Sequence, residues 1–257
     1  MKICNQKILC INVPITSIKT LPSIFSETET QCLFGERVKI INEENDWFFC
    51  ETLLDNYQGW IEKKLLTDFF DTNYRVNKIN TLVFEKPDLK SKVKFNLFLN
   101  SEVKVLDNSN NWSELKLSDS KGYIFSHHLI KKNKFLNDLI LLSENFLNVP
   151  YQWGGKSCLG IDCSGLVQLV LQSLGKFIPR NTSDQILVEN KFLKNTDIRE
   201  EISLIFWNKH VALLITKDTI IHSNAYHMCV QKENVDQAIK RFEKQNNKIL
   251  KIKKIIL

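Results

Sequence analysis

The sequence predicts an α+β protein in which two small β units precede a domain of helices and strands. Three observations support this fold class. A strand-like pattern in the first half recurs with a period of about 65 residues. A glycine-rich stretch after Pro150 is followed by apolar residues at helical spacing. Three short apolar runs between residues 203 and 223 then indicate consecutive strands. A chain of 257 residues can hold these three units.

The first β unit is predicted at residues 1–70. Short alternating or apolar runs are separated there by turn residues, which is typical of small β domains. We expect strands at 38–41, 47–52 and 59–61, with turns at 42–46 and 55–57. A short polar connector at 69–77 then leads to the second unit.

The second β unit is predicted at residues 76–131 and repeats the first. Residues 101–106 correspond to 35–41, residues 108–112 to 42–47, and residues 122–125 to 59–61. Each copy has a central Trp, an alternating run and a closing strand that begins with Gly and an aromatic residue. His127 and His128 come at the closing strand of the second copy, where we expect them on the surface.

The third unit is predicted at residues 133–257. Apolar residues between 135 and 147 form one stripe of a helix that Pro150 ends. A second helix begins at Cys163 and is expected to end at Gly175, which is a typical C-terminal cap. Strands at 203–207, 210–216 and 219–223 come after it, and then a polar helix at about 235–244.

Cys163 is the first candidate for chemistry. Five of the eight glycines lie between Gly154 and Gly175, so the backbone bends tightly around this cysteine. Unpaired N–H groups and the dipole at a helix N-terminus favour a thiolate, and we therefore expect a lowered pKa and a nucleophilic sulfur at Cys163. An inert buried cysteine is the alternative, because free Cys is among the most buried residue types.

Two histidines are candidates for the base that a cysteine nucleophile needs. His210 starts one predicted strand and His222 lies near the end of the next, so their rings can meet across a hairpin. This contact requires a three-residue loop, 216–218, which pairs Ala212 with His222; a two-residue turn would put the rings on opposite faces. Two structural histidines are the alternative.

Zinc binding is the rival chemistry for Cys163, His210 and His222. Structural zinc sites usually contain ligand pairs that are close in sequence, and none of these three residues is close to another. We therefore expect no metal and no cofactor. Seven cysteines, an odd count without a CxxC pair, predict neither a disulfide framework nor a zinc ribbon and favour a reducing compartment.

Charge and hydropathy exclude other partners. The net charge of +6 is mildly basic, and the lysine clusters lack interleaved aromatic residues, so we expect no nucleic-acid binding. We interpret these lysines as solvated: Lys131, Lys132, Lys134, Lys248, Lys251, Lys253 and Lys254. The N-terminal apolar run is interrupted by polar residues, and no run reaches the ~18 apolar residues of a membrane helix. We expect no signal peptide, no membrane span and a cytoplasmic location.

Residues 12–131 resemble two bacterial SH3-like barrels in their repeated pattern. Residues 134–230 resemble the NlpC-type cysteine peptidases of bacterial cell-wall peptides, whose domain is a reduced papain-like α+β fold. The second resemblance is carried by these residues: Tyr151, Trp153, Gly154, Gly155, Asp162 to Leu166, Pro179, Arg180, Gln185, His210 to Ala212, Ile221 and His222. It implies Cys163 as the nucleophile, His210 as general base and acid, and His222 as the residue that orients His210.

The resemblance also implies a substrate. Enzymes with two SH3-like modules ahead of this domain cut peptidoglycan stem peptides between γ-D-glutamate and the diamino acid when L-alanine is N-terminal. The residues expected to contact such a substrate are Glu27, Tyr57, Tyr151, Trp153, Asp162, Ser164, Arg180 and Thr182. Asp162, with Glu27 and Tyr57, would hold the free amine, and Arg180 would suit the α-carboxylate of the γ-linked glutamate. Two departures from the family pattern, at 181–182 and 201–204, weaken these substrate details.

Three classes of function remain open. The first is a cytoplasmic thiol dipeptidyl-peptidase that recycles murein peptides, and the second is an endopeptidase that acts on the intact wall. The absence of a recognisable export signal favours the first. The third is a catalytically silent wall-binding protein. The joint presence of Cys163, His210 and His222 argues against a silent domain, and the sequence leaves open whether the diamino acid is meso-diaminopimelate or lysine.

Overall fold

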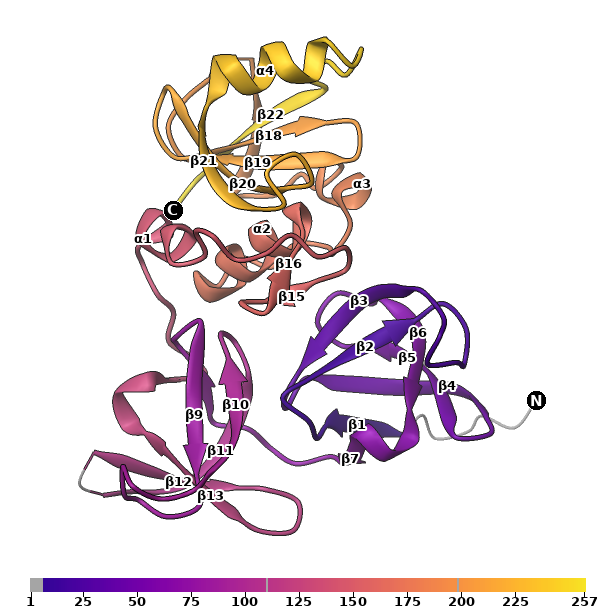
Figure 1. Cartoon of the computed structure of the whole chain (residues 1–257), viewed down its shortest axis with the longest axis vertical. Helices are drawn as coiled ribbons and strands as arrows, with labels where there is room; N and C mark the ends of the chain where they lie inside the picture. The colour runs from indigo at the N-terminus through magenta and orange to yellow at the C-terminus, as the bar shows by residue number, and fades with distance from the viewer. Residues whose placement is uncertain (1–6, 110, 198) are drawn as a thin grey trace. The chain divides into compact units, whose positions relative to one another are not determined.

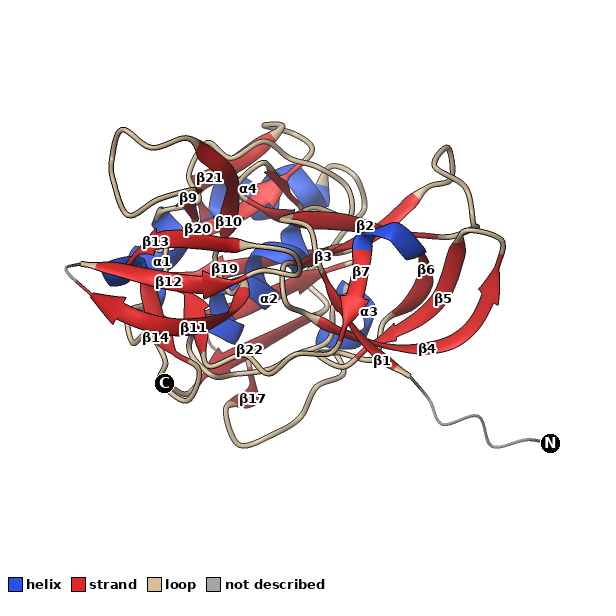
Figure 2. Cartoon of the chain, turned by 90° about the horizontal axis from the view of Figure 1, so that it is seen from below, coloured by secondary structure: helices blue, strands red, loops and turns tan. Residues whose placement is uncertain are grey.

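The computed structural model describes residues 7–109, 111–197 and 199–257. Strands dominate, and the helices are few and mostly short (Figure 2). The chain divides into two compact units, one up to Phe135 and one from Leu136 onward. Figure 1 labels the elements in chain order. The proposed domain limits, 1–70, 76–131 and 133–257, remain predictions.

The first unit contains two seven-stranded sheets of the same topology. In the first, the strand order is β3-β2-β6-β5-β4-β1-β7. Alternating residues such as Leu9, Ile11, Val38 and Ile61 point into its core, which is why these short runs form strands. The elements are β1 (Ile8–Ile11), β2 (Ile15–Lys19), β3 (Thr28–Leu33), β4 (Arg37–Glu44), β5 (Trp47–Thr52), β6 (Gln58–Glu62), the 3-10 turn η1 (Lys63–Leu65) and β7 (Leu66–Asp68).

The second sheet repeats this order as β10-β9-β13-β12-β11-β8-β14. The two sheets also share two bulges, at Glu29 and Lys94 and at Ile41 and Leu106, which confirms the internal repeat. The elements are β8 (Tyr74–Val76), β9 (Asn80–Phe84), β10 (Val93–Phe98), β11 (Glu102–Ser109), β12 (Trp112–Lys116), β13 (Lys121–Phe125), the 3-10 turn η2 (Ser126–His128) and β14 (Leu129–Lys131).

Two local predictions for these sheets were wrong in part. The turn expected at 42–46 is shorter, because the polar residues Asn42–Glu44 still pair with the aromatic start of β5, and the chain reverses at Asn45, which has a φ of 48°. His127 is exposed as expected. His128 is half-buried instead, with its Nδ1 2.7 Å from the Thr81 hydroxyl.

The turn between β3 and β4 joins the two sheets within the first unit. Phe34 is 2% exposed and belongs to the core of the second sheet, where its ring lies 6.1 Å from that of Phe95. The next residue, Gly35, has a φ of +78°, and a Cβ there would come within 2.0 Å of the Glu102 carbonyl oxygen. Only glycine allows this close approach.

The second unit is built on a six-stranded sheet of order β17-β22-β18-β19-β20-β21. Helices α2 and α4 lie on opposite sides of it (Figure 1). The central strands are therefore buried on both faces, which explains their continuous apolar runs. The strands are β15 (Lys156–Ser157), β16 (Gly160–Ile161), β17 (Leu193–Thr196), β18 (Ser203–Trp207), β19 (His210–Leu214), β20 (Thr219–Asn224), β21 (Cys229–Asn234) and β22 (Lys251–Ile255). The helices are α1 (Leu139–Glu144), α2 (Cys163–Ser173), α3 (Thr182–Gln185) and α4 (Val235–Glu243).

The helix predicted over 135–147 is shorter in the structure, as α1. Asp138 has extended backbone angles and caps the helix by accepting a hydrogen bond from Leu141 N at 2.9 Å, so the helix cannot extend further toward the N-terminus. Phe135 instead packs in the first unit, with its ring centre 4.8 Å from the Arg75 guanidinium. Helix α1 contacts α2.

The lysine-rich tail is not a solvated segment. Residues Lys251–Ile255 form β22, which lies between β17 and β18. Lys253 is fully buried, burial lowers its pKa, and its amine donates to the Val188 carbonyl oxygen. The solvated interpretation was therefore wrong for Lys253. Among the helices of the described ranges, none is long and apolar enough to span a bilayer.

Candidate active site

Cys163 is the first residue of α2, as predicted, and is 8% exposed. The preceding Asp162 caps the helix by accepting a hydrogen bond from Gly165 N at 2.7 Å. The helix ends at Ser173, and Gly175 is the expected C-terminal cap, with a φ of +74° and an N–H that donates to Gln172 O. These caps fix where the helix begins, and therefore where the Cys163 sulfur lies.

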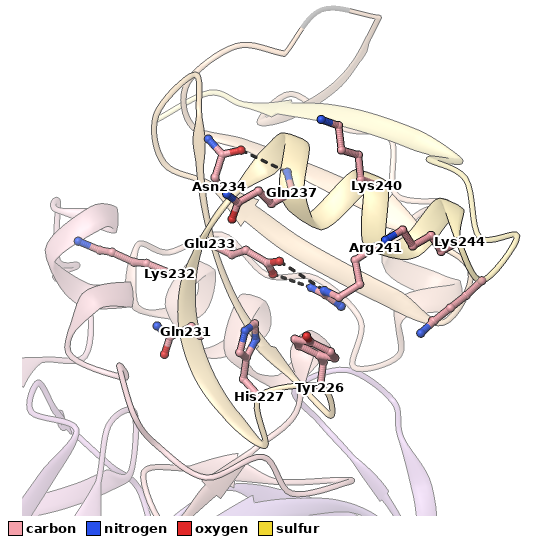
Figure 3. Close-up of a pocket in the computed structure, with 11 residues that line it drawn as sticks. Tyr226, His227, Gln231, Lys232, Glu233, Asn234, Gln237, Lys240, Arg241 and Lys244 are labelled. Carbon is pink, nitrogen blue, oxygen red and sulfur yellow. Dashed lines mark hydrogen bonds and ion pairs between the residues drawn. The ribbon is translucent and has the colours of Figure 1, made fainter.

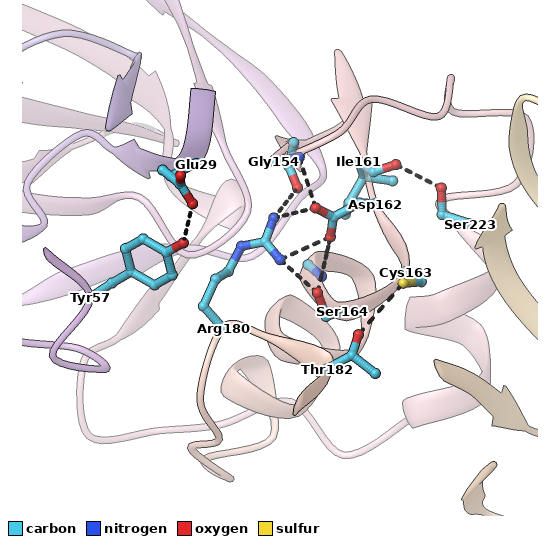
Figure 4. Close-up of polar contacts among 12 residues, drawn as sticks. Glu29, Tyr57, Gly154, Ile161, Asp162, Cys163, Ser164, Arg180, Thr182 and Ser223 are labelled. Atoms are coloured by element: carbon cyan, nitrogen blue, oxygen red, sulfur yellow. Dashed lines mark hydrogen bonds and ion pairs between the residues drawn. The ribbon is translucent and has the colours of Figure 1, made fainter. Parts of the chain in front are cut away.

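Asp162 is held from two further sides (Figure 4). Its Oδ2 accepts from Gly154 N at 2.9 Å, and the Arg180 guanidinium contacts both carboxylate oxygens, at 2.9 and 2.6 Å. Arg180 also donates to Gly155 O and to the Ser164 hydroxyl. The glycines allow this packing, since a Cβ on Gly165 would come within 2.5 Å of the Gly155 oxygen.

Arg180 is 3% exposed, and these contacts engage its guanidinium inside the fold. Its expected role as a contact for a substrate carboxylate remains a prediction, and these contacts give Arg180 a structural role instead. The residue neutralises Asp162 and positions the start of α2. The structure pairs Arg180 with a carboxylate through two contacts, but this carboxylate belongs to Asp162 of the protein itself.

The two histidines meet as the register argument predicted. Strands β19 and β20 pair Leu213 with Ile221 and Leu214 with Ile220, which is the register of a three-residue loop. Both rings consequently lie on one face of the sheet, and His210 Nε2 is 2.9 Å from His222 Nδ1. The two nitrogens are hydrogen-bonded directly to one another.

Cys163 lies beside the strand that carries His210. Helix α2 packs on β19 and β20, and the backbone of Val211, the residue after His210, is near enough to the Cys163 sulfur to lower the pKa of the thiol. Ser223, the residue after His222, donates from its hydroxyl to Ile161 O at 2.6 Å. The start of α2 is thus tied to the ends of β19 and β20 that carry the histidines.

Burial dominates the electrostatics of the site. It raises the pKa of the Cys163 thiol, and the Asp162 charge adds to this, whereas the contacts with Val211, Thr182 and Arg180 lower it by less. The expectation of a lowered pKa at Cys163 was therefore wrong. Burial, followed by His222 and Arg241, holds the pKa of His210 well below its usual value of 6.5. A neutral thiol beside a neutral imidazole is the resting pair that these shifts favour.

Sequence reasoning missed Glu233, on β21. His222 Nε2 is 3.0 Å from Glu233 Oε2. Arg241 of α4 contacts the same oxygen at 2.5 Å, and Figure 3 shows this ion pair. Burial raises the pKa of Glu233, but the bonds from His222 and Arg241 outweigh it and lower the pKa to about 2. The available signal was register, because β21 pairs with β20, but β21 itself was not predicted from the sequence.

Comparison with known proteins identifies this unit. Residues 148–246 match the NlpC/P60 family, and residues 21–66 match the bacterial dipeptidyl-peptidase SH3 domain. The second unit is an NlpC/P60 peptidase domain. It is preceded by an SH3-like module, as the sequence analysis predicted.

Two relatives and one solved structure extend this result. The chain is 28% identical to dipeptidyl-peptidase 6 of Lysinibacillus sphaericus over 79% of its length and 82% of that protein. It is 28% identical to a gamma-D-glutamyl-L-lysine dipeptidyl-peptidase of Bacillus cereus over 77% of its length and 68% of that protein. A crystal structure of an NlpC/P60 family protein from Bacillus cereus superposes with a TM-score of 0.78 at 21% identity, covering 89% of this chain and 94% of that one, and so shows the same fold.

Four other candidates lie in the NlpC/P60 domain. Thr182 places its hydroxyl 3.8 Å from the Cys163 sulfur. Ser164 is buried against Asp162, which accepts from its hydroxyl at 3.3 Å. Burial, followed by the Cys163 and Asp162 charges, raises the pKa of Tyr151 to about 12. Trp153 is 69% exposed. Their roles in substrate binding remain predictions.

In the first unit, the carboxylate beside Tyr57 is not the one expected. Tyr57 donates its hydroxyl to Glu29 Oε2 at 2.9 Å (Figure 4). Glu27 is exposed, and only two positions separate it from Glu29. Glu29 occupies the bulge of β3, which displaces it from the regular alternation of a strand. Glu29 is therefore a better candidate than Glu27 for acting together with Tyr57.

One group of side chains in the part of the chain that the structure describes has the spacing of metal ligands. Donor atoms of His222, His227 and Glu233 lie within 4.8 Å of one another. However, the Glu233 carboxylate is already hydrogen-bonded to His222 and Arg241. The positive guanidinium therefore occupies the carboxylate that a metal cation would need as a ligand. We do not identify this group as a metal site.

Proposed function

We propose that the protein is a thiol peptidase that cuts peptidoglycan-derived peptides with a free N-terminal L-alanine between γ-D-glutamate and the diamino acid, in the recycling of murein peptides. The observation that carries this proposal is Cys163 at the start of α2, beside the strand of a His210–His222 pair. Relatives named as dipeptidyl-peptidases, one of them specific by name for γ-D-glutamyl-L-lysine, support the substrate.

The proposed reaction uses one sulfur and one imidazole. His210 Nε2 is engaged with His222, so Nδ1 is the nitrogen that remains for the thiol proton. As Nδ1 takes that proton, the Cys163 sulfur attacks the γ-carbonyl carbon of the glutamyl residue. His210 then returns the proton to the leaving amine of the diamino acid. Water, deprotonated by the same nitrogen, hydrolyses the thioester and frees L-Ala-γ-D-Glu.

Hydrolysis of the tripeptide L-Ala-γ-D-Glu-diamino acid tests this proposal. The lysine and meso-diaminopimelate forms should be compared, and Cys163→Ala should abolish release of the diamino acid. Cys158→Ser is the matched control, because Cys158 is a free thiol nearby in sequence and should be dispensable. Full activity of Cys163→Ala would refute a thiol mechanism. Digestion of intact wall without digestion of the tripeptide would favour the endopeptidase, and wall binding without hydrolysis would favour the silent protein.

The free amine of the substrate is a second point to test. Loss of the charged partner of a desolvated ammonium costs on the order of 2–5 kcal/mol, so acetylation of the tripeptide should lower kcat/KM by orders of magnitude. We assign a share of this recognition to Glu29, because Tyr57 holds its carboxylate. Glu29→Gln should reduce the difference in kcat/KM between the free and the acetylated tripeptide, and Glu27→Gln should leave that difference unchanged. Equal cleavage of both peptides by the wild type would rule out an exopeptidase.

The proposal includes a cytoplasmic location. Cys158, Cys163 and Cys229 are free thiols, which suits a reducing compartment. Fractionation of cells that make the native protein, with a cytoplasmic and a secreted marker, would test it. Recovery with the secreted marker would shift the substrate toward the intact wall.

A further inference from the structure

Four charged or polar side chains form one hydrogen-bonded row behind the proposed nucleophile. It runs from His210 through His222 and Glu233 to Arg241, with contacts of 2.9, 3.0 and 2.5 Å. We propose that Glu233 is a positioning residue that sets the tautomers of both histidines, and through them keeps His210 Nδ1 free to act as the base. This inference rests on the proposed function, in which His210 is that base.

The first step is the direction of the Glu233 bond. With its pKa lowered to about 2, the Glu233 carboxylate is ionised at any pH near neutrality and can only accept hydrogen bonds. His222 Nε2 must therefore carry the proton of the 3.0 Å contact. In a neutral imidazole the other nitrogen then has a lone pair, so His222 Nδ1 is an acceptor.

The second step carries this direction to His210. Because His222 Nδ1 accepts, the 2.9 Å contact requires that His210 Nε2 donates. The neutral His210 ring then leaves Nδ1 without a proton, ready to take the one from Cys163. In the opposite arrangement His222 Nδ1 carries the proton and donates a hydrogen bond to His210 Nε2. A neutral His210 would then be protonated at Nδ1 and could not act as the base. Of the two possible directions of these hydrogen bonds, Glu233 thus selects the one that leaves His210 Nδ1 free.

Arg241 holds the Glu233 carboxylate in place and opposes its effect on the pKa of His222. The guanidinium contacts Glu233 with two nitrogens, and its carbon is 4.5 Å from the ring centre of Tyr226 and 4.8 Å from that of Phe242. Its charge lowers the pKa of His210 and His222, opposing the rise that Glu233 causes at His222. Arg241 thus offsets part of the stabilisation that Glu233 gives to a protonated His222, and burial keeps the pKa of His222 below its usual value. Other charged or titratable groups near the described site include Asp162, Cys163, Arg180, His227, Tyr151 and Tyr226.

A merely structural ion pair on the same helix supplies the control. Arg199 contacts Asp236 of α4 at 2.6 Å, and both side chains are exposed. Asp236→Asn removes a carboxylate of similar geometry, three positions from Glu233, that touches neither histidine. The variants are therefore Glu233→Gln, Glu233→Ala, Arg241→Met and Asp236→Asn in the full chain, each checked by circular dichroism and melting temperature.

The primary readout is the tautomeric state of the histidines. The chain has five histidines, so uniform ¹⁵N-histidine labelling gives spectra that can be assigned one ring at a time. At neutral pH, the wild type and Asp236→Asn should show protonated Nε2 and unprotonated Nδ1 in both His210 and His222. Glu233→Ala and Glu233→Gln should show mixed tautomers. Wild-type tautomers in both folded Glu233 variants would overturn the inference.

Kinetics and titration give the second readout. Because the tautomer acts on the chemical step, Glu233→Gln should lower kcat by about tenfold or more while KM changes little. The pH at which the histidine pair loses its proton should move down in Glu233→Gln and up in Arg241→Met. Shifts in the same direction, or a rise in KM alone, would contradict the inference. The tautomers are measured without substrate, so failure of the tripeptide assay would refute the proposed function and would leave this test intact.

Discussion

At Cys163 two local effects oppose one another. The start of α2 favours a thiolate by about 0.3–1 kcal/mol, the usual size of a helix-dipole effect, up to ∼2 kcal/mol in favourable partly buried sites. Burial disfavours it, and the adjacent Asp162 charge acts in the same direction. Burial prevails because Cys163 is only 8% exposed, so the residue has lost nearly all its contact with water. The thiol thus needs His210 as a base at the moment of attack.

The same balance predicts an unusual acid limb of the pH profile. His210 must be neutral to accept the proton, and its pKa is held well below 6.5 by burial, then by His222 and Arg241. Activity should therefore persist as the pH falls through 6.5 and be lost only at lower pH. The measurement is kcat/KM between about pH 4 and pH 9. His127→Ala, at an exposed site, is the control, and a midpoint at or above 6.5 in the wild type would contradict the burial argument.

At the scale of elements, the decisive feature is the buried Asp162–Arg180 pair at the start of α2. The carboxylate caps the helix, and the guanidinium compensates its charge. Removing either side chain alone would therefore leave the other as an uncompensated charge in the protein interior. The pair sets the position of Cys163, and its two charges shift the pKa of the thiol in opposite directions.

Arg180→Met should therefore destabilise the second unit by about 3–5 kcal/mol, the cost of leaving a buried charge without its partner. Urea unfolding of the full chain, monitored in the transition of this unit, measures the loss. Arg199→Met, which removes an exposed pair, should cost about 1 kcal/mol or less. A stable Arg180→Met protein with only a raised KM would favour the substrate-binding role.

At the scale of the whole molecule, the first unit is a repeat whose two sheets share one turn. Phe34 and Gly35 leave the first sheet, and the Phe34 ring completes the core of the second. The Phe34 carbonyl also accepts from Glu102 N at 2.9 Å. The two modules are thus coupled through this turn within one compact unit.

Phe34→Ala should therefore destabilise the first unit by about 3–5 kcal/mol, as expected for truncation of a buried phenylalanine. Differential scanning calorimetry of the full chain should show its transition at a lower temperature. Phe25→Ala is the matched control, because Phe25 is 93% exposed and its loss should change little. An unchanged transition in Phe34→Ala would show that the two sheets are not coupled by this side chain.

The sequence by itself determined the local periodicities and the features that depend on them. The 65-residue repeat, the start of α2 at Cys163, its end at Gly175 and the register that joins His210 to His222 all depend on spacing along one or two neighbouring elements. Strand alternation and helix capping are local rules, so one sequence is enough to apply them.

Only the tertiary structure decided which partners distant residues choose. Arg180 bonds Asp162, Tyr57 bonds Glu29, His222 bonds Glu233, and Lys253 lies in a strand inside the sheet. Periodicity predicts none of these contacts. A polar or charged side chain at a given position can face solvent, bind a ligand or pair with a buried group, and the local sequence pattern is the same in all three cases. The pKa of Cys163 was misjudged for the same reason: its largest determinant is desolvation, which depends on every element packed around the sulfur.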